Sequence, residues 1–151
     1  MLNYLSTAGL AARVAVEDAV VRMFVATDER DWAQLEDCFT NPFTLDMTSM
    51  MGGSPAEMTP REITEAWAAG FQPLDHVHHQ IGNLRTEVTG DKALVRCHGI
   101  ALHHRGQARG LKSRLFVGSY EISLQASEDR WRISRLVFRL KFIDGNLQLE
   151  Q

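Results

Sequence analysis

"HHQIGNLRTEVTGDKALVRCHGIALHHR", residues 78–105, is the stretch of sequence that decides the fold. Its two halves have the pattern of long strands, and the TGD between them at 89–91 is a strong hairpin signal. The same arrangement follows downstream, where GLKSRLFVGSYEISLQ (110–125) and RWRISRLVFRLKFI (130–143) flank ASED. The second half of the chain is therefore predicted to form four long antiparallel strands.

The first half of the chain has helical spacing instead. Apolar residues recur at this spacing from about Ala11 to Thr27, which predicts an amphipathic helix. The charged residues on the other face of this helix are Glu17, Arg22 and Asp28.

A second, shorter helix is predicted after Asp31, which is a good N-cap. Asn41-Pro42 ends it, because the residue before a proline is pushed out of the helical region. FTLDM (43–47) then alternates between apolar and polar residues, as a short strand does. TSMMGGSPAEM (48–58) is rich in glycine, serine and methionine, which suits a mobile loop or lid.

A third helix has clear start and stop signals. Thr59 is the N-cap, Pro60 the first helical residue and Glu62 the capping-box partner, while Gly70 can end the helix. Three helices followed by four strands make an α+β domain, with the helices packed on one face of a curved sheet. Such a sheet leaves a concave mouth that suits a small apolar ligand.

The bulk properties narrow the class of protein. A chain of 151 residues is predicted to be a single domain, residues 1–151. A net charge of −3 speaks against nucleic acid as a partner. Cys38 and Cys97 are far apart without a CxxC spacing, which indicates reduced thiols in a cytoplasmic protein. Charged residues interrupt the apolar N-terminal stretch, so neither a signal peptide nor a membrane span is predicted.

Histidines are concentrated in the first predicted hairpin. LDHVHHQIGN (74–83) holds three of the six, and His103 and His104 form a doublet 25 residues after the doublet His78 and His79. Neighbouring residues of a strand point to opposite faces, so each doublet sends one imidazole to each face of the sheet.

The hairpin register decides which histidines meet. If residues 90–91 form a two-residue turn, His79 lies opposite Leu102, and His104 is its diagonal neighbour at about 7–8 Å on the same face. The remaining member of each doublet then lies on the other face. A three-residue turn would cross this pairing, and so would a bulge. The glycines at which a bulge could form are Gly82 and Gly99.

These residue types suit acid–base chemistry. Histidine is the usual general acid or base at neutral pH, and it works best when a carboxylate orients it. Asp46 is the candidate carboxylate, because it lies in a short and otherwise apolar strand, where an acid needs a partner. His76 and His78 could chelate a metal from one strand face, but no Cys or Glu cluster completes a set, so no metal site is predicted.

The chain resembles the nuclear transport factor 2-like superfamily, in its SnoaL-like and scytalone-dehydratase-like branch, over about residues 13–144. The resemblance rests on VEDAVVRMFVATDERDWAQLEDCFTNPFTLDMTS, HHQIGN, TGDKALVRCHGIALHHR and WRISRLVFRLKF, in this order. It implies a cone-shaped α+β barrel, in which a curved antiparallel or mixed sheet wraps around N-terminal helices and encloses one deep pocket. It also implies a homodimer packed through the outer sheet.

The resemblance further implies site residues. In the dehydratase branch, one Asp of the early strand and two His of the middle hairpin perform acid–base elimination. These match Asp46, His79 and His104, the last because the family's separation between the two histidines is also 25. Dehydratases of this branch also use tyrosines near the Asp and on the helix–loop segment, whereas this chain has only Tyr4 and Tyr120, at neither position.

The leading prediction is an enzyme that moves protons on a small, partly apolar cyclic or polyketide-like substrate, by dehydration or isomerisation. His79 is the expected base, Asp46 its partner and His104 the second acid–base group, and such chemistry needs no metal or organic cofactor. The predicted ligand-binding residues are Phe24, Trp32, Phe43, Trp67, Phe71, Asn83, Phe116 and Phe138.

Two other functions stay open. A ligand-binding module would hold a small molecule without turning it over, and the missing tyrosines favour this alternative. The chain also resembles the small subunits of ring-hydroxylating dioxygenases, which would make it a structural partner in a larger assembly. The oligomeric state of the isolated protein distinguishes the last alternative from a homodimer.

Overall fold

A computed structural model describes residues 6–151 of the chain, so Tyr4 lies outside the described residues. The elements in this range are α1 (Thr7–Glu29), α2 (Trp32–Asp37), β1 (Phe39–Asp46), α3 (Thr48–Met51), β2 (Ala56–Met58), α4 (Pro60–Phe71), β3 (His76–Thr89), β4 (Lys92–His104), β5 (Ser113–Ser127) and β6 (Arg130–Gly145). Across the same range, no helix is both long and apolar enough to cross a membrane.

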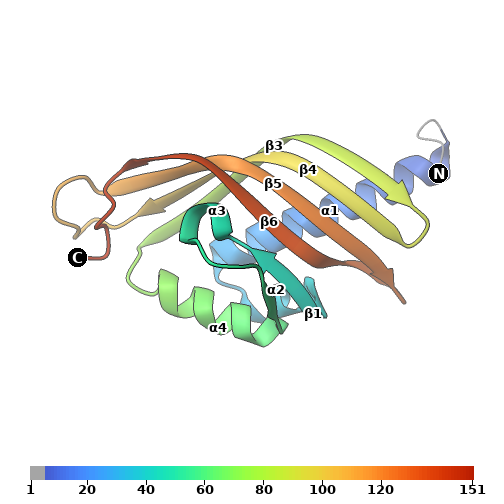
Figure 1. The fold of residues 1–151 in the computed structure, drawn as a ribbon, viewed down its shortest axis with the longest axis horizontal. Coiled ribbons are helices and arrows are strands. Elements are labelled where there is room, and N and C mark those ends of the chain that lie inside the picture. Colours follow the sequence, from blue (N-terminus) through green and yellow to red (C-terminus); the bar gives the residue numbers. More distant parts are fainter. Residues whose placement is uncertain (1–5) are drawn as a thin grey trace.

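The strands form one mixed sheet in the order β2-β1-β6-β5-β4-β3. β1 runs parallel to β6, and the other neighbours are antiparallel. The long strands β3 to β6 arch over α1, and α2 and α4 lie below the strands in the view of Figure 1. A curved sheet wrapped around N-terminal helices is therefore confirmed. The sheet stays open at β2 and β3 rather than closing into a barrel, because α1 packs against β3.

The helix starts follow the predicted capping signals. At the start of α2, the Asp31 carboxylate accepts a hydrogen bond from the backbone N–H of Gln34. At the start of α4, the Thr59 hydroxyl accepts from the backbone N–H of Glu62, and the Glu62 carboxylate accepts from the backbone N–H of Thr59 at 2.7 Å. Both caps satisfy N–H groups that have no partner inside the helix.

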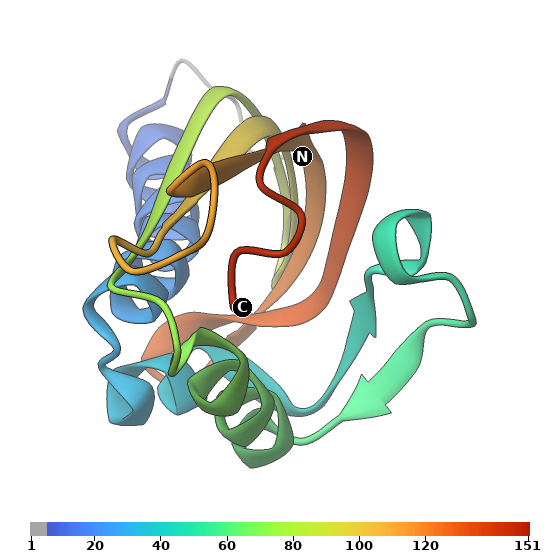
Figure 2. The same cartoon turned by 90° about the vertical axis from the view of Figure 1, so that its left-hand side faces the viewer.

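The segment after α2 is more regular than predicted. β1 begins at Phe39, ahead of the expected strand, because β6 runs alongside it and the rings of Phe39 and Phe43 stack at 4.2 Å in the core. Residues 48–58, predicted as a loop or lid, contain α3 and β2, and β2 pairs with β1. This arm of β1, α3 and β2 extends away from α1 (Figure 2).

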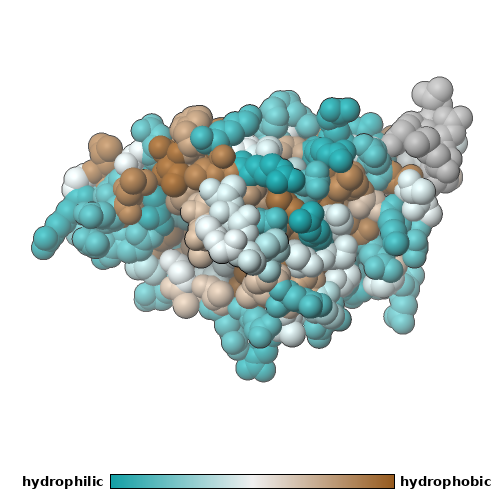
Figure 3. Space-filling model, viewed as in Figure 1, coloured by the Kyte–Doolittle hydropathy of each residue, from teal (hydrophilic) through white to brown (hydrophobic). Residues whose placement is uncertain are grey.

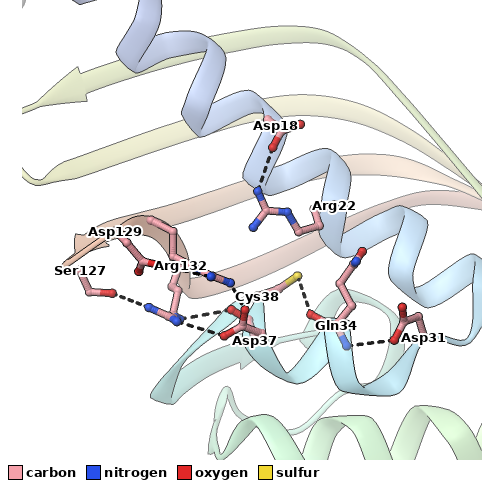
Figure 4. Close-up of polar contacts among 10 residues, drawn as sticks. Asp18, Arg22, Asp31, Gln34, Asp37, Cys38, Ser127, Asp129 and Arg132 are labelled. Carbon is pink, nitrogen blue, oxygen red and sulfur yellow. Dashed lines mark hydrogen bonds and ion pairs between the residues drawn. The ribbon is translucent and has the colours of Figure 1, made fainter.

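A polar cluster joins α2 to the turn between β5 and β6 (Figure 4). Arg132 donates to the Asp37 carboxylate at 3.0 Å and to the Ser127 hydroxyl at 2.7 Å, and Arg130 also donates to Asp37. Exposed ion pairs contribute little stability individually. Together these contacts link the end of α2 to the ends of β5 and β6.

The two cysteines are free and buried, as the sequence predicted. The Cys38 thiol donates to the backbone carbonyl of Gln34 at 3.2 Å (Figure 4). Burial raises the pKa of Cys38 and of Cys97 to about 11, so both remain protonated and pack as small apolar groups.

The first hairpin has the predicted two-residue turn, followed by a register shift inside β3. Thr89 pairs with Lys92 next to the turn, and this register continues to Arg85. A bulge between Gly82 and Arg85 then inserts one extra residue into β3, where Asn83 has a φ of 55°. From His76 to Gly82, each side chain of β3 therefore lies on the opposite face of the sheet from the one that the turn alone predicts.

Candidate functional site

A cavity of about 660 Å³ lies between the concave face of the sheet, α1, α4 and the arm of β1, α3 and β2. Its wall is mostly apolar. The predicted ligand-binding residues that line it are Phe24, Trp67, Phe71, Phe116 and Phe138. The methionines that line it are Met23, Met47, Met50, Met51 and Met58.

Three predicted ligand-binding residues do not line this cavity. Phe43 is buried in the core against Phe39, and Trp32 packs at the edge of the same core from the start of α2. Asn83 forms the bulge of β3, and its amide nitrogen lies 3.0 Å from Nδ1 of His98. Apolar character alone did not separate a core aromatic residue from a cavity aromatic residue.

His79 lines the cavity and is held by a carboxylate from α1. Its Nδ1 lies 2.6 Å from Oδ1 of Asp28, and its backbone N–H donates to Oδ2 of Asp28 at 2.8 Å. Only 12% of the His79 side chain and 16% of the Asp28 side chain are exposed. One carboxylate oxygen therefore holds the ring and the other holds the backbone, which fixes the position of the imidazole.

The same contact determines which ring nitrogen is available to a ligand. An ionised carboxylate only accepts hydrogen bonds, so the Nδ1 of His79 donates to Asp28. In the neutral ring the lone pair is then on Nε2. A carboxylate in this position orients the imidazole, sets its tautomer and stabilises the imidazolium that forms when Nε2 takes a proton. The pair therefore has the arrangement of a general base.

Asp28 was predicted to lie on the charged outer face of α1, and Asp46 was predicted as the partner of His79. The helix carries Asp28 inward, because Val20 and Phe24 are buried at intervals of four residues and Asp28 is the next member of that series. The ring of Phe24 lies 5.4 Å from that of His79. A carboxylate that continues a buried series at this spacing was the available signal.

The bulge in β3 changes which histidine of the second doublet accompanies His79. His79 pairs with Ala101 instead of Leu102, so its diagonal neighbour on the concave face is His103. His104 lies on the convex face. The predicted placement of His79 beside His104 is therefore wrong. A bulge that crosses the pairing was the alternative left open, and the structure has this crossed pairing.

His104 has partners outside the cavity. Its Nδ1 lies 2.8 Å from the Ser113 hydroxyl, and its ring lies 6.1 Å from that of His76. Over residues 6–151, no three His, Cys, Asp or Glu side chains are close enough together to hold a metal ion.

His103 is buried in the cavity wall between the rings of Phe71 and Phe116, at 5.4 and 5.1 Å. Arg114 donates to Nδ1 of His103 from its Nε and Nη2, at 3.3 and 3.2 Å. Because a guanidinium cannot accept a hydrogen bond, the proton of the neutral imidazole is on Nε2. Burial and then the charge of Arg114 lower the pKa of His103 to about 4. At neutral pH His103 is therefore an uncharged N–H donor.

Asp46 does not line the cavity, although Leu45 before it does. It accepts hydrogen bonds from the Thr48 hydroxyl at 2.7 Å and the Thr48 backbone N–H at 3.1 Å, and lies 3.5 Å from Arg135. The Thr48 hydroxyl and then its N–H hold the pKa of Asp46 below its usual value. The alternation of β1 thus directs this acid to the start of α3, and the predicted contact with His79 is absent.

Tyr120 lines the cavity from β5, next to β4, the strand that carries His103. Its ring packs against Phe24 at 5.0 Å and Phe138 at 4.9 Å. It also covers Gly99, where an added Cβ would lie 2.2 Å from the Tyr120 Cε2. Burial raises the pKa of Tyr120 above its usual value, so the phenol stays protonated. No role of Tyr120 could be predicted from the sequence, because the space that its ring uses is made by a glycine on the neighbouring strand.

The chemistry of the wall follows from these three side chains. His79, His103 and Tyr120 come from the adjacent strands β3, β4 and β5. The first provides a nitrogen lone pair, and the other two provide uncharged N–H and O–H groups. Such a wall can take a proton from a C–H group, and it offers a hydrogen-bond donor at each of two places to an oxygen on which negative charge develops.

Comparison with known proteins agrees with this architecture. The SnoaL-like domain family matches residues 8–137. No protein of curated function matches the chain.

Solved structures of similar fold cover almost the whole chain. Kfla4162 from Kribbella flavida has a TM-score of 0.86 and 23% identity, and the match covers 94% of this chain and 98% of that one. A candidate scytalone dehydratase from Novosphingobium aromaticivorans has a TM-score of 0.79 and 14% identity, covering 90% of this chain and 88% of that one. The hexachlorocyclohexane dehydrochlorinase LinA-type3 from Novosphingobium barchaimii has a TM-score of 0.75 and 18% identity, covering 92% of each chain.

At these identities the similar structures show a shared fold. The family match spans most of the chain, from α1 to the middle of β6, and so includes the strands that carry both cavity histidines. The chain belongs to the SnoaL-like family of the nuclear transport factor 2-like superfamily.

Proposed function

We propose that this SnoaL-like protein is an enzyme that moves a proton on a small, partly apolar cyclic molecule, by elimination of water or by isomerisation, without a cofactor. The observation that carries this proposal is the Asp28–His79 pair at a mostly apolar cavity of about 660 Å³. Two proteins of similar structure are named for eliminations, one as a candidate dehydratase and one as a dehydrochlorinase. Their names support the same class of reaction for this chain.

The proposed reaction begins with a C–H group next to a substrate carbonyl. His79 takes this proton at Nε2, Asp28 stabilises the resulting imidazolium, and the C–H electron pair moves into the enolate. When the carbonyl forms again, this pair becomes a new C=C bond and the C–O bond to a β-hydroxyl breaks. The leaving oxygen takes the proton from Nε2, so the products are a conjugated ketone and water. In an isomerisation, the same proton returns to another carbon.

His103 or Tyr120 has a separate role in this proposal, according to which of them the carbonyl oxygen lies against, because the register of β4 and β5 places them at different positions along the sheet. Negative charge develops on the carbonyl oxygen as the enolate forms, and preorganised donors lower the energy of that state. A neutral imidazole and a neutral phenol are suited to this role, because each offers a hydrogen-bond donor without a charge that would have to be desolvated. The low pKa of His103 and the high pKa of Tyr120 keep both groups neutral near pH 7.

Matched variants test the assignment on a panel of cyclic β-hydroxy ketones, with water loss followed by the ultraviolet absorbance of the conjugated product. His79→Gln removes the base and Asp28→Asn alters its tautomer, so each is expected to lower kcat/KM by about 10²–10⁴-fold. His104→Gln and Asp46→Asn make the same chemical changes outside the cavity, and they should keep wild-type turnover. Undiminished turnover in His79→Gln, or an equal loss in the control variants, would show the assignment to be wrong.

The same cavity also suits a binding module without turnover, since most of its wall is apolar. Deuterium exchange separates the two functions. The proposed enzyme exchanges the α-proton of a bound ketone in D₂O, and His79→Gln stops the exchange. Ketones that bind tightly but neither exchange a proton nor lose water would identify a binding protein instead.

A further inference from the structure

A charged pair lies in the cavity wall in addition to the groups that transfer or donate protons. Arg114 of β5 and Glu150 both line the cavity, and Glu150 belongs to residues 146–151, named here the closing segment. The Arg114 side chain is only 13% exposed. A guanidinium so far removed from water needs partners that replace its hydration.

The partners of Arg114 fix the plane of its guanidinium. The group lies over the Phe116 ring, 5.3 Å from its centroid, and two of its nitrogens donate to Nδ1 of His103. The Glu150 carboxylate accepts from Nη1 at 3.0 Å and also from Nη2. This two-point contact between a planar fork and a carboxylate is the geometry by which arginine selects carboxylates.

The closing segment is anchored independently of this ion pair. Leu149 is fully buried in a small apolar cluster of its own. The Asn146 side chain donates to the backbone carbonyls of Arg109 and Leu111, both at 2.8 Å. The segment, dark red in Figure 2, crosses the open end of the curled sheet. The carboxylate of Glu150 can therefore leave Arg114 while the segment stays in place.

The carboxyl group of Glu150 is ionised in its contact with Arg114. Desolvation pushes the pKa of Glu150 upward, but hydrogen bonding and the charge of Arg114 outweigh this effect and hold the pKa below its usual value. The side chain is also 36% exposed, so it has a route to solvent when another group takes its place.

We propose that Arg114 is a carboxylate-binding subsite of the cavity, and that Glu150 is the chain's own carboxylate at that place. The ligand is then a mostly apolar molecule with one carboxylate, which displaces Glu150 from the guanidinium while the apolar body extends toward His79. His103 links the two ends, since it contacts Arg114 and is the diagonal neighbour of His79. The naming of this substrate class rests on the proposed function, whereas the subsite itself does not.

Two probes of the same shape test the subsite by calorimetry: naphthalene-1-carboxylate and the neutral naphthalene-1-carboxamide. Glu150→Gln removes the internal competitor, so affinity for the carboxylate should rise by about tenfold or more. Affinity for the amide should stay nearly constant. Arg114→Gln removes the subsite, so the carboxylate should bind no better than the amide.

A merely structural ion pair gives a different result. In that case Glu150→Gln changes the affinity for both probes alike or for neither, and either result would overturn the proposal. If Arg114→Gln fails to fold, Glu150→Gln decides alone, because it leaves the guanidinium on His103 and Phe116. Glu121→Gln is the matched control, since Glu121 pairs with Arg96 outside the cavity and its loss should alter neither affinity.

Asp28→Asn separates this proposal from the proposed function. It is expected to stop proton transfer while the preference for the carboxylate probe remains. A preference for the carboxylate probe in wild-type protein that turns over none of the ketones would support the subsite and count against the enzyme. The reverse pattern, turnover of neutral ketones with no effect of Glu150→Gln on either probe, would overturn the subsite alone.

Discussion

At the scale of single residues, His79 and His103 have opposite tautomers because their partners differ in kind. A carboxylate accepts from Nδ1 of His79, and a guanidinium donates to Nδ1 of His103. Nε2 is therefore an acceptor on the first ring and a donor on the second, although the two rings are diagonal neighbours on one sheet face. Asp28 and Arg114 thus decide the division of roles between two identical side chains.

His103 should make stability depend on pH. Its pKa is about 4 in the folded chain against an ordinary value of 6.5, so the unfolded chain takes up this proton first as the pH falls. The contribution of neutral His103 to the free energy of unfolding is complete above pH 6.5 and is lost as the pH falls to 4. The loss is roughly 3 kcal/mol, since each unit of difference in pKa corresponds to 1.36 kcal/mol.

Urea denaturation at pH 7 and pH 4 checks this expectation. Other groups also titrate in this range, so the comparison between variants carries the result. His103→Gln should lose about 3 kcal/mol less than the wild type between the two pH values. His104→Gln should follow the wild type, because His104 lies on the convex face. Parallel losses in the wild type and His103→Gln would rule out a buried neutral imidazole.

At the scale of elements, the features that could be predicted from the sequence are the helix caps and the hairpin turn. The caps at Asp31 and Thr59 and the turn after Thr89 are all present, because each depends on a few neighbouring residues. The bulge at Asn83 inserts a single residue into a strand whose alternation continues on both sides. The inward orientation of Asp28 was also missed, because a charged residue at the end of a buried series on a helix resembles the start of the polar face.

The contact between β4 and β5 at Gly99 gives a prediction about packing. Gly99→Ala would place a Cβ 2.2 Å from Cε2 of Tyr120, so the ring must move into the cavity. This change should lower the free energy of unfolding by about 1–3 kcal/mol. Gly82→Ala is the matched control in the same hairpin, where an added Cβ meets nothing within 4 Å, and it should stay within about 0.5 kcal/mol of the wild type.

Urea denaturation measures both glycine variants, and a change in near-ultraviolet circular dichroism in Gly99→Ala but not in Gly82→Ala reports the rearranged packing of aromatic rings. Equal stability of Gly99→Ala and Gly82→Ala would mean that the ring has room to move without cost. The close approach of Tyr120 to the β4 backbone would then not be a constraint on the sheet.

At the scale of the whole molecule, the convex face of the sheet carries an apolar row. Ile100, Val117 and Phe142 are neighbours across β4, β5 and β6, and Ile100 and Phe142 are 46% and 54% exposed. Figure 3 shows apolar surface over the last part of β6. Exposed apolar surface of this kind is typical of an interface between proteins. We expect a second copy of the chain to cover it.

The oligomeric state of the purified protein tests this expectation by light scattering after size exclusion. The wild type should be a homodimer, and Phe142→Glu should be a monomer, because a charge in the row would be buried without a partner. Val14→Glu is the control, since Val14 is 57% exposed on α1, away from the sheet face. A monomeric wild type would contradict the expectation, and a stable homodimer speaks against an obligate larger assembly.

The carboxylate at Arg114 shows why the cavity could be predicted from the sequence only in part. The family resemblance places a pocket under the sheet, but Glu150 reaches that pocket because the chain turns back at Gly145, which has a φ of 99°. Leu149 then anchors the return by its burial. Such a return depends on the packing of distant segments and leaves no periodicity to detect.

The bulge in β3 also bears on how this chain could have diverged from its relatives. If β3 kept its residues but lost the bulge at Asn83, the register of the turn would continue upstream, so His79 would pair with Leu102 on the convex side and His78 with His103 on the cavity side. The choice of the histidine that faces the cavity therefore depends on a single bulge, and a comparison of relatives by conserved residue types alone would not detect its loss.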